Sequence, residues 1–443
     1  MNIPKIKNAL ENIKTTCENK MSILYPVNPP EDIITRYHQE LTYLEHSEFL
    51  DDFELFRLLS NEASKCSTII TMRGTIMGSF IYYLLGNNCF NPLPAHYYCP
   101  KCGHYELVNT HLFGIDLPEK TCPDCGTPIL ADGYNIPLES VWGTDGKKLL
   151  SFDYNICSEF LPFARRVLER LYPENEIVPW GMFVFDSSNT PPKPSTSAIG
   201  VGLNGYAILP LGNTINDYPD LISYLENGDP CVTGGGWKLE NNFLKPIHLY
   251  SLEYLEMLIK LQRATGIYVN DIYNKELRDI TWNNLFSTTI LNTAASNYFH
   301  ELKPKTFKDM VNVESITHST FTWQDGEYQN LREFEIMTSS NSFKKYPCFT
   351  REDFFDYLID DGYDRNFAFD VSERIRKGHA NSAKFKEDFF ALQIPEEMKE
   401  VAKNYLYLFP RAHCVEYILI FARLAYYAKT DSRTFSKIVY RRK

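Results

Sequence analysis

The sequence Cys99-Pro100-Lys101-Cys102 is followed, after nineteen residues, by Cys122-Pro123-Asp124-Cys125. Four thiolates spaced as C-x2-C-x19-C-x2-C can close a tetrahedron around one Zn²⁺ ion. The glycine after each pair, Gly103 or Gly126, favours the tight turn that aims backbone amides at the sulfur atoms. Four unpaired or disulfide-linked cysteines are the alternative. Because sulfur would fill all four positions, a structural zinc ion is predicted on Cys99, Cys102, Cys122 and Cys125.

The composition is that of a globular protein of two or three subdomains. The chain has 443 residues, of which 44% are hydrophobic and 14% aromatic, enough to bury a substantial core. It contains no apolar run long enough to cross a bilayer, and its first residues lack the apolar stretch of a signal peptide. Of its eleven cysteines, those outside the two pairs are scattered singly, which is typical of a reducing cytoplasm. A cytoplasmic protein without a membrane partner is therefore predicted.

The net charge of −11 argues against a strong nonspecific grip on nucleic acid, because neutralising phosphates requires basic surface. The acidic excess lies in the first 300 residues, and acids and bases are nearly balanced in residues 301–443. A local basic groove in the second half of the chain remains compatible with this charge.

Polarity patterns predict an α+β fold in three consecutive parts. Residues 1–65 have the amphipathic spacing of helices. Residues 66–270 combine strand patterns with the predicted zinc module at residues 96–130. From residue 271 to residue 443 the chain is predicted to be mostly helical.

The flanks of the cysteine pairs carry a family resemblance. The stretches 91–102, 114–127 and 132–139, together with Met72-Arg73-Gly74-Thr75, Gly78-Ser79, Arg376-Lys377-Gly378 and Phe409-Pro410-Arg411-Ala412-His413, resemble the PolC-type DNA polymerase III α subunit of low-GC Gram-positive bacteria. The similarity runs in order from about residue 30 to 440, and only about 180–240 matches poorly. It implies a polymerase III-like palm that carries the four-cysteine zinc module, followed by a large helical fingers domain, in a truncated and degenerate copy.

In this family, two Mg²⁺ ions are held by three carboxylates, and they activate the primer hydroxyl and the incoming triphosphate. The first two carboxylates form Asp-x-Asp on one strand, but the matching residues here are Ser151-Phe152-Asp153. The third family Asp aligns with Ile247 or His248. Asp153 is therefore predicted to be the remnant of the catalytic site, with Mg²⁺ as a cofactor only if the protein is active. The alternatives are that Asp153 is solvated or caps a turn, or that a nearby glutamate (Glu240, Glu253 or Glu256) has become a substitute ligand.

The resemblance also suggests residues that contact a nucleotide or phosphate. These candidates are Arg73, Gly78, Ser79, Arg376, Lys377, Arg411 and His413. A turn with Gly and Ser before a helix can cradle a phosphate, although such turns are common without one. Cations at the end of a helix also interact favourably with its dipole, and a histidine on an apolar helix can simply be a core residue.

Three functional hypotheses follow. The first is a catalytically inactive PolC-like core that binds a nucleotide, primer-template DNA or a replisome partner and modulates or mimics the host replicative polymerase. The second is an active DNA-directed DNA polymerase with a rearranged metal site. The third is a zinc-stabilised scaffold for protein interactions.

Overall fold

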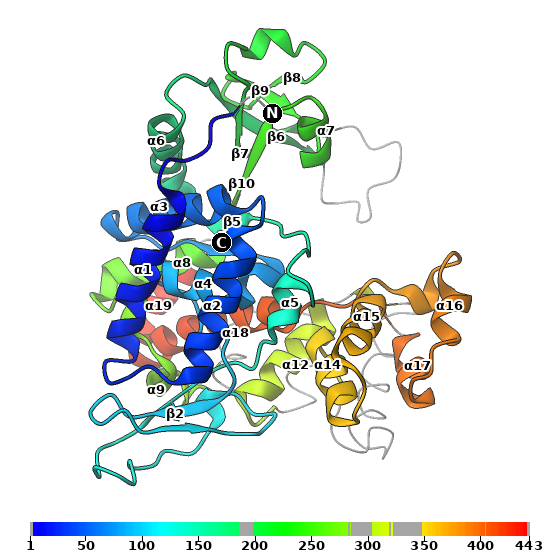
Figure 1. Cartoon of the computed structure of the whole chain (residues 1–443). Coiled ribbons are helices and arrows are strands. Elements are labelled where there is room, and N and C mark those ends of the chain that lie inside the picture. The colour runs from blue at the N-terminus through cyan, green and yellow to red at the C-terminus, as the bar shows by residue number, and fades with distance from the viewer. Residues whose placement is uncertain are drawn as a thin grey trace.

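The computed structural model describes residues 3–185, 198–281, 284, 304–318, 320–321, 348–403 and 405–440. Helices and strands are mixed along the chain, and one large sheet contains both parallel and antiparallel pairs. The predicted α+β class is therefore confirmed. Figure 1 shows a helical body, a lobe of strands above it, and a group of helices extending to one side.

The first part of the chain consists of three helices: α1 (Ala9–Leu24), α2 (Glu31–Glu45) and α3 (Leu50–Lys65). Each has one buried face, in keeping with its amphipathic spacing. With the short helix α4 (Phe80–Leu85) they form the helical layer seen in blue in Figure 1.

A seven-stranded sheet links this body to the upper lobe. Its strand order is β1-β5-β10-β7-β6-β9-β8, with bounds β1 Thr71–Met72, β5 Asp153–Ile156, β6 Ile177–Phe185, β7 Ala198–Ile208, β8 Ile222–Tyr224, β9 Pro230–Thr233 and β10 Lys245–Ser251. The pairs β5–β10 and β6–β9 are parallel, and the other pairs are antiparallel. In Figure 1, β10 runs from the lobe down to β5 in the body. The site described below lies at this junction.

The remaining helices surround the body and extend from it. Their bounds are α5 Leu138–Trp142, α6 Leu161–Leu171, α7 Gly236–Asn241, α8 Glu253–Thr265, α9 Asn274–Leu277, α12 Phe307–His318, α14 Arg351–Asp360, α15 Arg365–Arg376, α16 Lys386–Phe390, α17 Glu396–Ala402, α18 Arg411–Thr430 and α19 Ser432–Val439. Two short strands, β11 (Thr320–Phe321) and β12 (Tyr405–Tyr407), pair with each other. Within the described part of the chain, no helix is both long and apolar enough to cross a membrane.

Two apolar cores organise most of these helices. The larger core joins α1–α4, the sheet, α8 and α12 with α18 and α19, whereas a separate core is built from residues 348–408. Helix α18 is buried along most of its length and lies across the body in Figure 1. The last two helices thus pack with the first half of the chain, although the sequence boundaries placed them in the 271–443 part.

The predicted zinc module forms a three-stranded sheet, β3-β2-β4, below the helical body. Its strands are β2 His96–Tyr98, β3 Tyr105–Leu107 and β4 Leu130–Asp132. The Tyr98 hydroxyl donates a hydrogen bond of 3.1 Å to the carbonyl of Val27, so the module is fastened to the segment between α1 and α2.

The four predicted ligands converge in this module. All four Sγ atoms lie within 4.8 Å of one another, with 3.5 Å between Cys99 and Cys125 and 3.4 Å between Cys102 and Cys122. For comparison, Zn–S bonds of about 2.3 Å in a tetrahedron place sulfur atoms roughly 3.8 Å apart. All eleven cysteines are free thiols. These four could therefore hold a metal ion such as Zn²⁺.

The two glycines beside the cysteine pairs have the conformation that the turns require. Gly103 has φ 77° and Gly126 has φ 69°, in the left-handed region that favours glycine. The amide of Gly103 donates to the Cys99 carbonyl, and that of Gly126 to the Cys122 carbonyl, each at 2.9 Å. Both turns are therefore closed in the same way.

The geometry of the four cysteines generates a first prediction. Replacing Cys102 by Ser should remove bound zinc and lower the melting temperature, because a structural zinc ion contributes its binding free energy to folding. Zinc content is measured by inductively coupled plasma mass spectrometry, and stability by thermal unfolding. The matched control is Cys66→Ser, which alters a partly exposed cysteine outside the module. A Cys102→Ser protein that keeps a full equivalent of zinc would contradict the assignment.

Glu416 on α18 generates a second prediction. Burial raises the pKa of its carboxyl from the ordinary value of 4.5 to about 7, and its Oε1 atom has no hydrogen-bond partner among the described residues. The folded state therefore keeps a proton that the unfolded state loses above pH 4.5, so the free energy of unfolding should fall as pH rises from about 4.5 through 7.

Glu416→Gln should remove this pH dependence and stabilise the protein at pH 8, by on the order of 2 kcal/mol. Thermal unfolding at pH 6 and pH 8 measures the effect. A variant whose melting temperature depends on pH as steeply as that of the unaltered protein would show that Glu416 is ionised when folded.

Candidate functional site

The parallel pairing of β5 and β10 places Asp153 opposite His248. The distance between Asp153 Oδ1 and His248 Nδ1 is 3.3 Å, and the two side chains are 29% and 22% exposed. The Tyr250 hydroxyl lies 2.8 Å from the same Nδ1 atom. Ile247, by contrast, is buried in the main core, because neighbouring residues of a strand point to opposite faces. Of the two positions aligned with the third family carboxylate, His248 is thus the one that faces Asp153.

Arg73 lies beside this pair, directly after β1. Its backbone amide donates to the Asp153 carbonyl at 3.0 Å, and its Nε donates to Asn155 Oδ1 at 2.6 Å. The guanidinium carbon lies 4.2 Å from the centre of the Tyr250 ring, a distance at which a cation–π interaction orients an arginine. Arg73 forms no ion pair with any residue that the structure describes.

His413, in the first turn of α18, joins the same neighbourhood. Its Nδ1 accepts a hydrogen bond of 3.4 Å from the amide of Gly74, the residue after Arg73. The imidazole stacks on Phe409, with 4.6 Å between ring centroids, and lies 4.9 Å from the Tyr417 ring. The structure therefore brings three of the predicted residues, Arg73, Asp153 and His413, to one place.

The poorly matching stretch 180–240 covers part of this site. The Trp180 ring meets the His248 ring edge-on, with 4.0 Å between centroids, and its indole N–H donates to the Gly234 carbonyl at 2.9 Å. A Cβ atom at Gly236 would lie 3.2 Å from His248 Nε2, so this glycine permits a close approach of the loop. The sequence showed only that this stretch matches the family poorly and gave no sign of its contact with β10.

The protonation of His248 follows from these contacts. Burial lowers the pKa of its imidazole; the negative charge of Asp153 opposes this effect, and the positive charge of Arg73 adds to it. His248 is therefore expected to be neutral at neutral pH.

Among the residues that the structure describes, the site holds one carboxylate where the resemblance implies three. Ser151 stands near the turn after β1, since a Cβ at Gly74 would lie 4.0 Å from its hydroxyl. Glu256, one of the substitute ligands considered, accepts a hydrogen bond of 2.8 Å from Ser158. Among the described residues, clusters of three or more potential metal ligands occur only in the four-cysteine module. The arrangement around Asp153 can present a cation and hydrogen-bond groups to a ligand, but not a set of metal-binding carboxylates.

Gly78 and Ser79 lie at the start of α4. There the carboxylate of Glu40 occupies the position predicted for a phosphate. The Ser79 hydroxyl and the amide of Phe80 donate to Glu40, at 2.5 and 2.9 Å. Ser79 and Glu40 are fully buried, and a Cβ at Gly78 would lie 2.5 Å from the Ile136 side chain. The sequence contained no signal for Glu40. A phosphate contact at this turn remains a prediction that this geometry does not favour.

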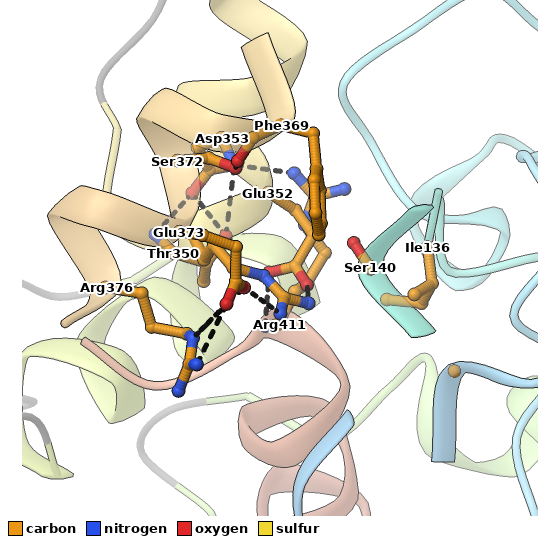
Figure 2. Close-up of polar contacts among 12 residues, drawn as sticks. Ile136, Ser140, Thr350, Glu352, Asp353, Phe369, Ser372, Glu373, Arg376 and Arg411 are labelled. Carbon is orange, nitrogen blue, oxygen red and sulfur yellow. Dashed lines mark hydrogen bonds and ion pairs between the residues drawn. The ribbon is translucent and has the colours of Figure 1, made fainter. Parts of the chain in front are cut away.

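Arg411 belongs to a buried ion-pair network (Figure 2). The side chain is only 2% exposed, and one of its terminal nitrogens lies 2.8 Å from Asp353 and 2.7 Å from Asp356. Its backbone amide donates to Glu352 at 2.6 Å. Burial alone would raise the pKa of Asp353, but the cations Lys308 and Arg411 hold that pKa well below its usual range. This geometry supports a role in positioning α18, while the predicted nucleotide contact of Arg411 stays a prediction.

Arg376 and Lys377 lie at the end of α15. Arg376 pairs with Glu373 at 2.9 Å, as Figure 2 shows. It also donates to the Tyr407 hydroxyl at 3.1 Å. Lys377 is exposed to solvent. The structure thus places these two cations near the Arg411 network, and their predicted phosphate contacts remain predictions.

The sequence of the chain is similar to those of known DNA polymerases. No family model matches the chain. Over 481 aligned residues it is 27% identical to the PolC-type DNA polymerase III of Bacillus subtilis, an alignment that covers 96% of the chain and 32% of that protein. The corresponding enzymes of Caldanaerobacter subterraneus and Thermotoga maritima are 24% and 25% identical, again over 96% of the chain.

These curated relatives are much longer than the chain, which spans about a third of their length. The resemblance predicted from the cysteine flanks and the scattered motifs is confirmed by alignments that include nearly all of its residues. The chain is a partial PolC-like sequence.

Proposed function

We propose that this protein is a catalytically inactive PolC-like polymerase core that binds a nucleotide, primer-template DNA or a replisome partner, and thereby modulates or mimics the replicative polymerase. The similarity to PolC-type polymerases supports a function related to DNA replication. The observation that carries the proposal of inactivity is the pairing of Asp153 with His248 across β5 and β10. The free cysteines are in keeping with the proposed cytoplasmic location.

Electrostatics explains why this pairing argues against catalysis. Two Mg²⁺ ions held a few ångströms apart repel each other strongly, and bridging carboxylates offset that repulsion. Here a hydroxyl (Ser151) and a neutral imidazole (His248) stand at the two other positions, and the cationic Arg73 is adjacent. Magnesium also prefers oxygen ligands to imidazole. Asp153 alone would hold at most a weakly bound ion.

The two alternative hypotheses make different demands on the chain. An active enzyme would need a second and a third ligand, and the glutamates of α8 would have to be redirected toward Asp153. A purely protein-binding scaffold would not need a partly exposed Arg73 without an ion-pair partner among the described residues. This partly exposed cation therefore favours ligand binding without catalysis.

Primer extension tests the proposal. With a primer-template, all four dNTPs and either Mg²⁺ or Mn²⁺, the protein should add no nucleotide, because the described residues around Asp153 offer no second metal-binding carboxylate. Asp153→Ala should behave like the unaltered protein. Extension that Asp153→Ala abolishes would instead establish an active polymerase with a rearranged metal site.

A gain-of-ligand variant supplies a second, independent test. Ser151→Asp combined with His248→Asp gives the site three carboxylates, Asp153 included. This double variant should bind Tb³⁺ at least about tenfold more tightly than the unaltered protein. Terbium luminescence reports this directly, because Trp180 packs against position 248 and can sensitise a nearby ion. The matched control carries Ser151→Asn and His248→Asn, which are similar in size without the charge. Equal Tb³⁺ affinity in both double variants would contradict the proposed reason for inactivity.

A further inference from the structure

We propose that the site around Arg73 and His248, together with the exposed ring of Trp237, binds a nucleoside polyphosphate without any divalent cation. This inference rests on the nucleotide-binding part of the proposed function and deepens it. Binding would need no divalent cation, and Trp237, in the 180–240 stretch, would contact the base.

The charge of the site is the first argument. Three carboxylates would repel a polyphosphate unless metal ions lay between them. Here the single negative charge of Asp153 faces His248 at 3.3 Å and is balanced by Arg73, which is anchored beside it through Asn155. Because the side chains already offset the carboxylate, phosphate oxygens can approach without bridging cations.

The orientation of Arg73 is the second argument. Its Nε donates to Asn155 and its guanidinium carbon lies 4.2 Å from the centre of the Tyr250 ring, so two contacts hold the side chain in place without a ligand. No described residue forms an ion pair with it. A guanidinium fixed in this way retains terminal N–H donors in the fork geometry that matches phosphate oxygens.

The loop that covers His248 is the third argument. Gly236 approaches the imidazole closely, and the next residue, Trp237, is 70% exposed. A Cβ at Gly235 would lie 2.9 Å from Trp237 Nε1, so the indole packs over the loop backbone and leaves much of its surface uncovered. Trp237, which follows the glycine beside His248, thus offers a large aromatic surface on which a base can stack.

The experiment measures dATP binding by isothermal titration calorimetry with the full chain, in EDTA and in Mg²⁺. Binding in EDTA should be at least as tight as in Mg²⁺, since no metal ion takes part and Mg²⁺ chelates part of the free dATP. Trp237→Ala should weaken binding about 5- to 150-fold, the range that corresponds to loss of one stacked base. The matched control is Phe243→Ala, which removes another ring that is 64% exposed and should leave the affinity unchanged.

Two further arms identify which part of the ligand is recognised. Tripolyphosphate, which has no base, should bind the unaltered protein more weakly than dATP does. It should bind Trp237→Ala as tightly as it binds the unaltered protein. His248→Asp should weaken dATP binding at least about tenfold in EDTA, and Mg²⁺ should restore part of it, because a second carboxylate now requires a cation. Thermal unfolding confirms that each variant is folded.

Several outcomes would overturn the inference. Binding that appears only with Mg²⁺ would show metal-dependent recognition, and equal affinity of dATP and tripolyphosphate would remove the role of Trp237. Absence of dATP binding in both conditions would overturn it as well, and would point to a protein partner. None of these results bears on catalytic inactivity, which primer extension tests separately.

Discussion

The parallel pairing of β5 with β10 is the constraint that sets the geometry of the candidate site. Its register is fixed because Ile247 must enter the apolar core, and a slip by one residue would expose it while burying His248. Once Ile247 is inside, His248 faces Asp153. The packing of one aliphatic side chain thus determines that an imidazole occupies the position across from the remaining carboxylate.

Helix α18 connects this site to the second half of the chain. At its first turn the buried Arg411 is fixed by Asp353 and Asp356, while His413 accepts a hydrogen bond from the turn that follows β1. Removing one partner of a buried ion pair is costly, because the other charge is left without compensation. The Arg411 network can therefore be essential for the geometry of the site without touching a ligand.

Local patterns in the sequence were sufficient for part of this description. The four-cysteine module could be predicted because its ligands and glycine turns lie within 28 consecutive residues, from Cys99 to Gly126, and thiolate spacing directly constrains geometry. The sequence also identified the strand that carries Asp153, and it showed that the two other family carboxylates are replaced. Long-range partners could not: the contact of Glu40 with the start of α4, and that of Trp180 with His248, depend on packing between segments far apart in the chain. The burial of Arg411 was likewise invisible, since an arginine is usually exposed.

The most direct test of the central claim is to count the Mn²⁺ ions held by the unaltered protein in the presence of dATP, by electron paramagnetic resonance. The four-cysteine module is kept loaded with zinc so that only the site at Asp153 is measured. If neutral His248 stands in place of a metal-binding carboxylate and Arg73 offsets the charge of Asp153, no Mn²⁺ should bind tightly, and the spectrum should be that of free ion and Mn²⁺–dATP. A spectrum of two magnetically coupled Mn²⁺ ions that disappears in Asp153→Ala would contradict the account, because it would show an intact two-metal site.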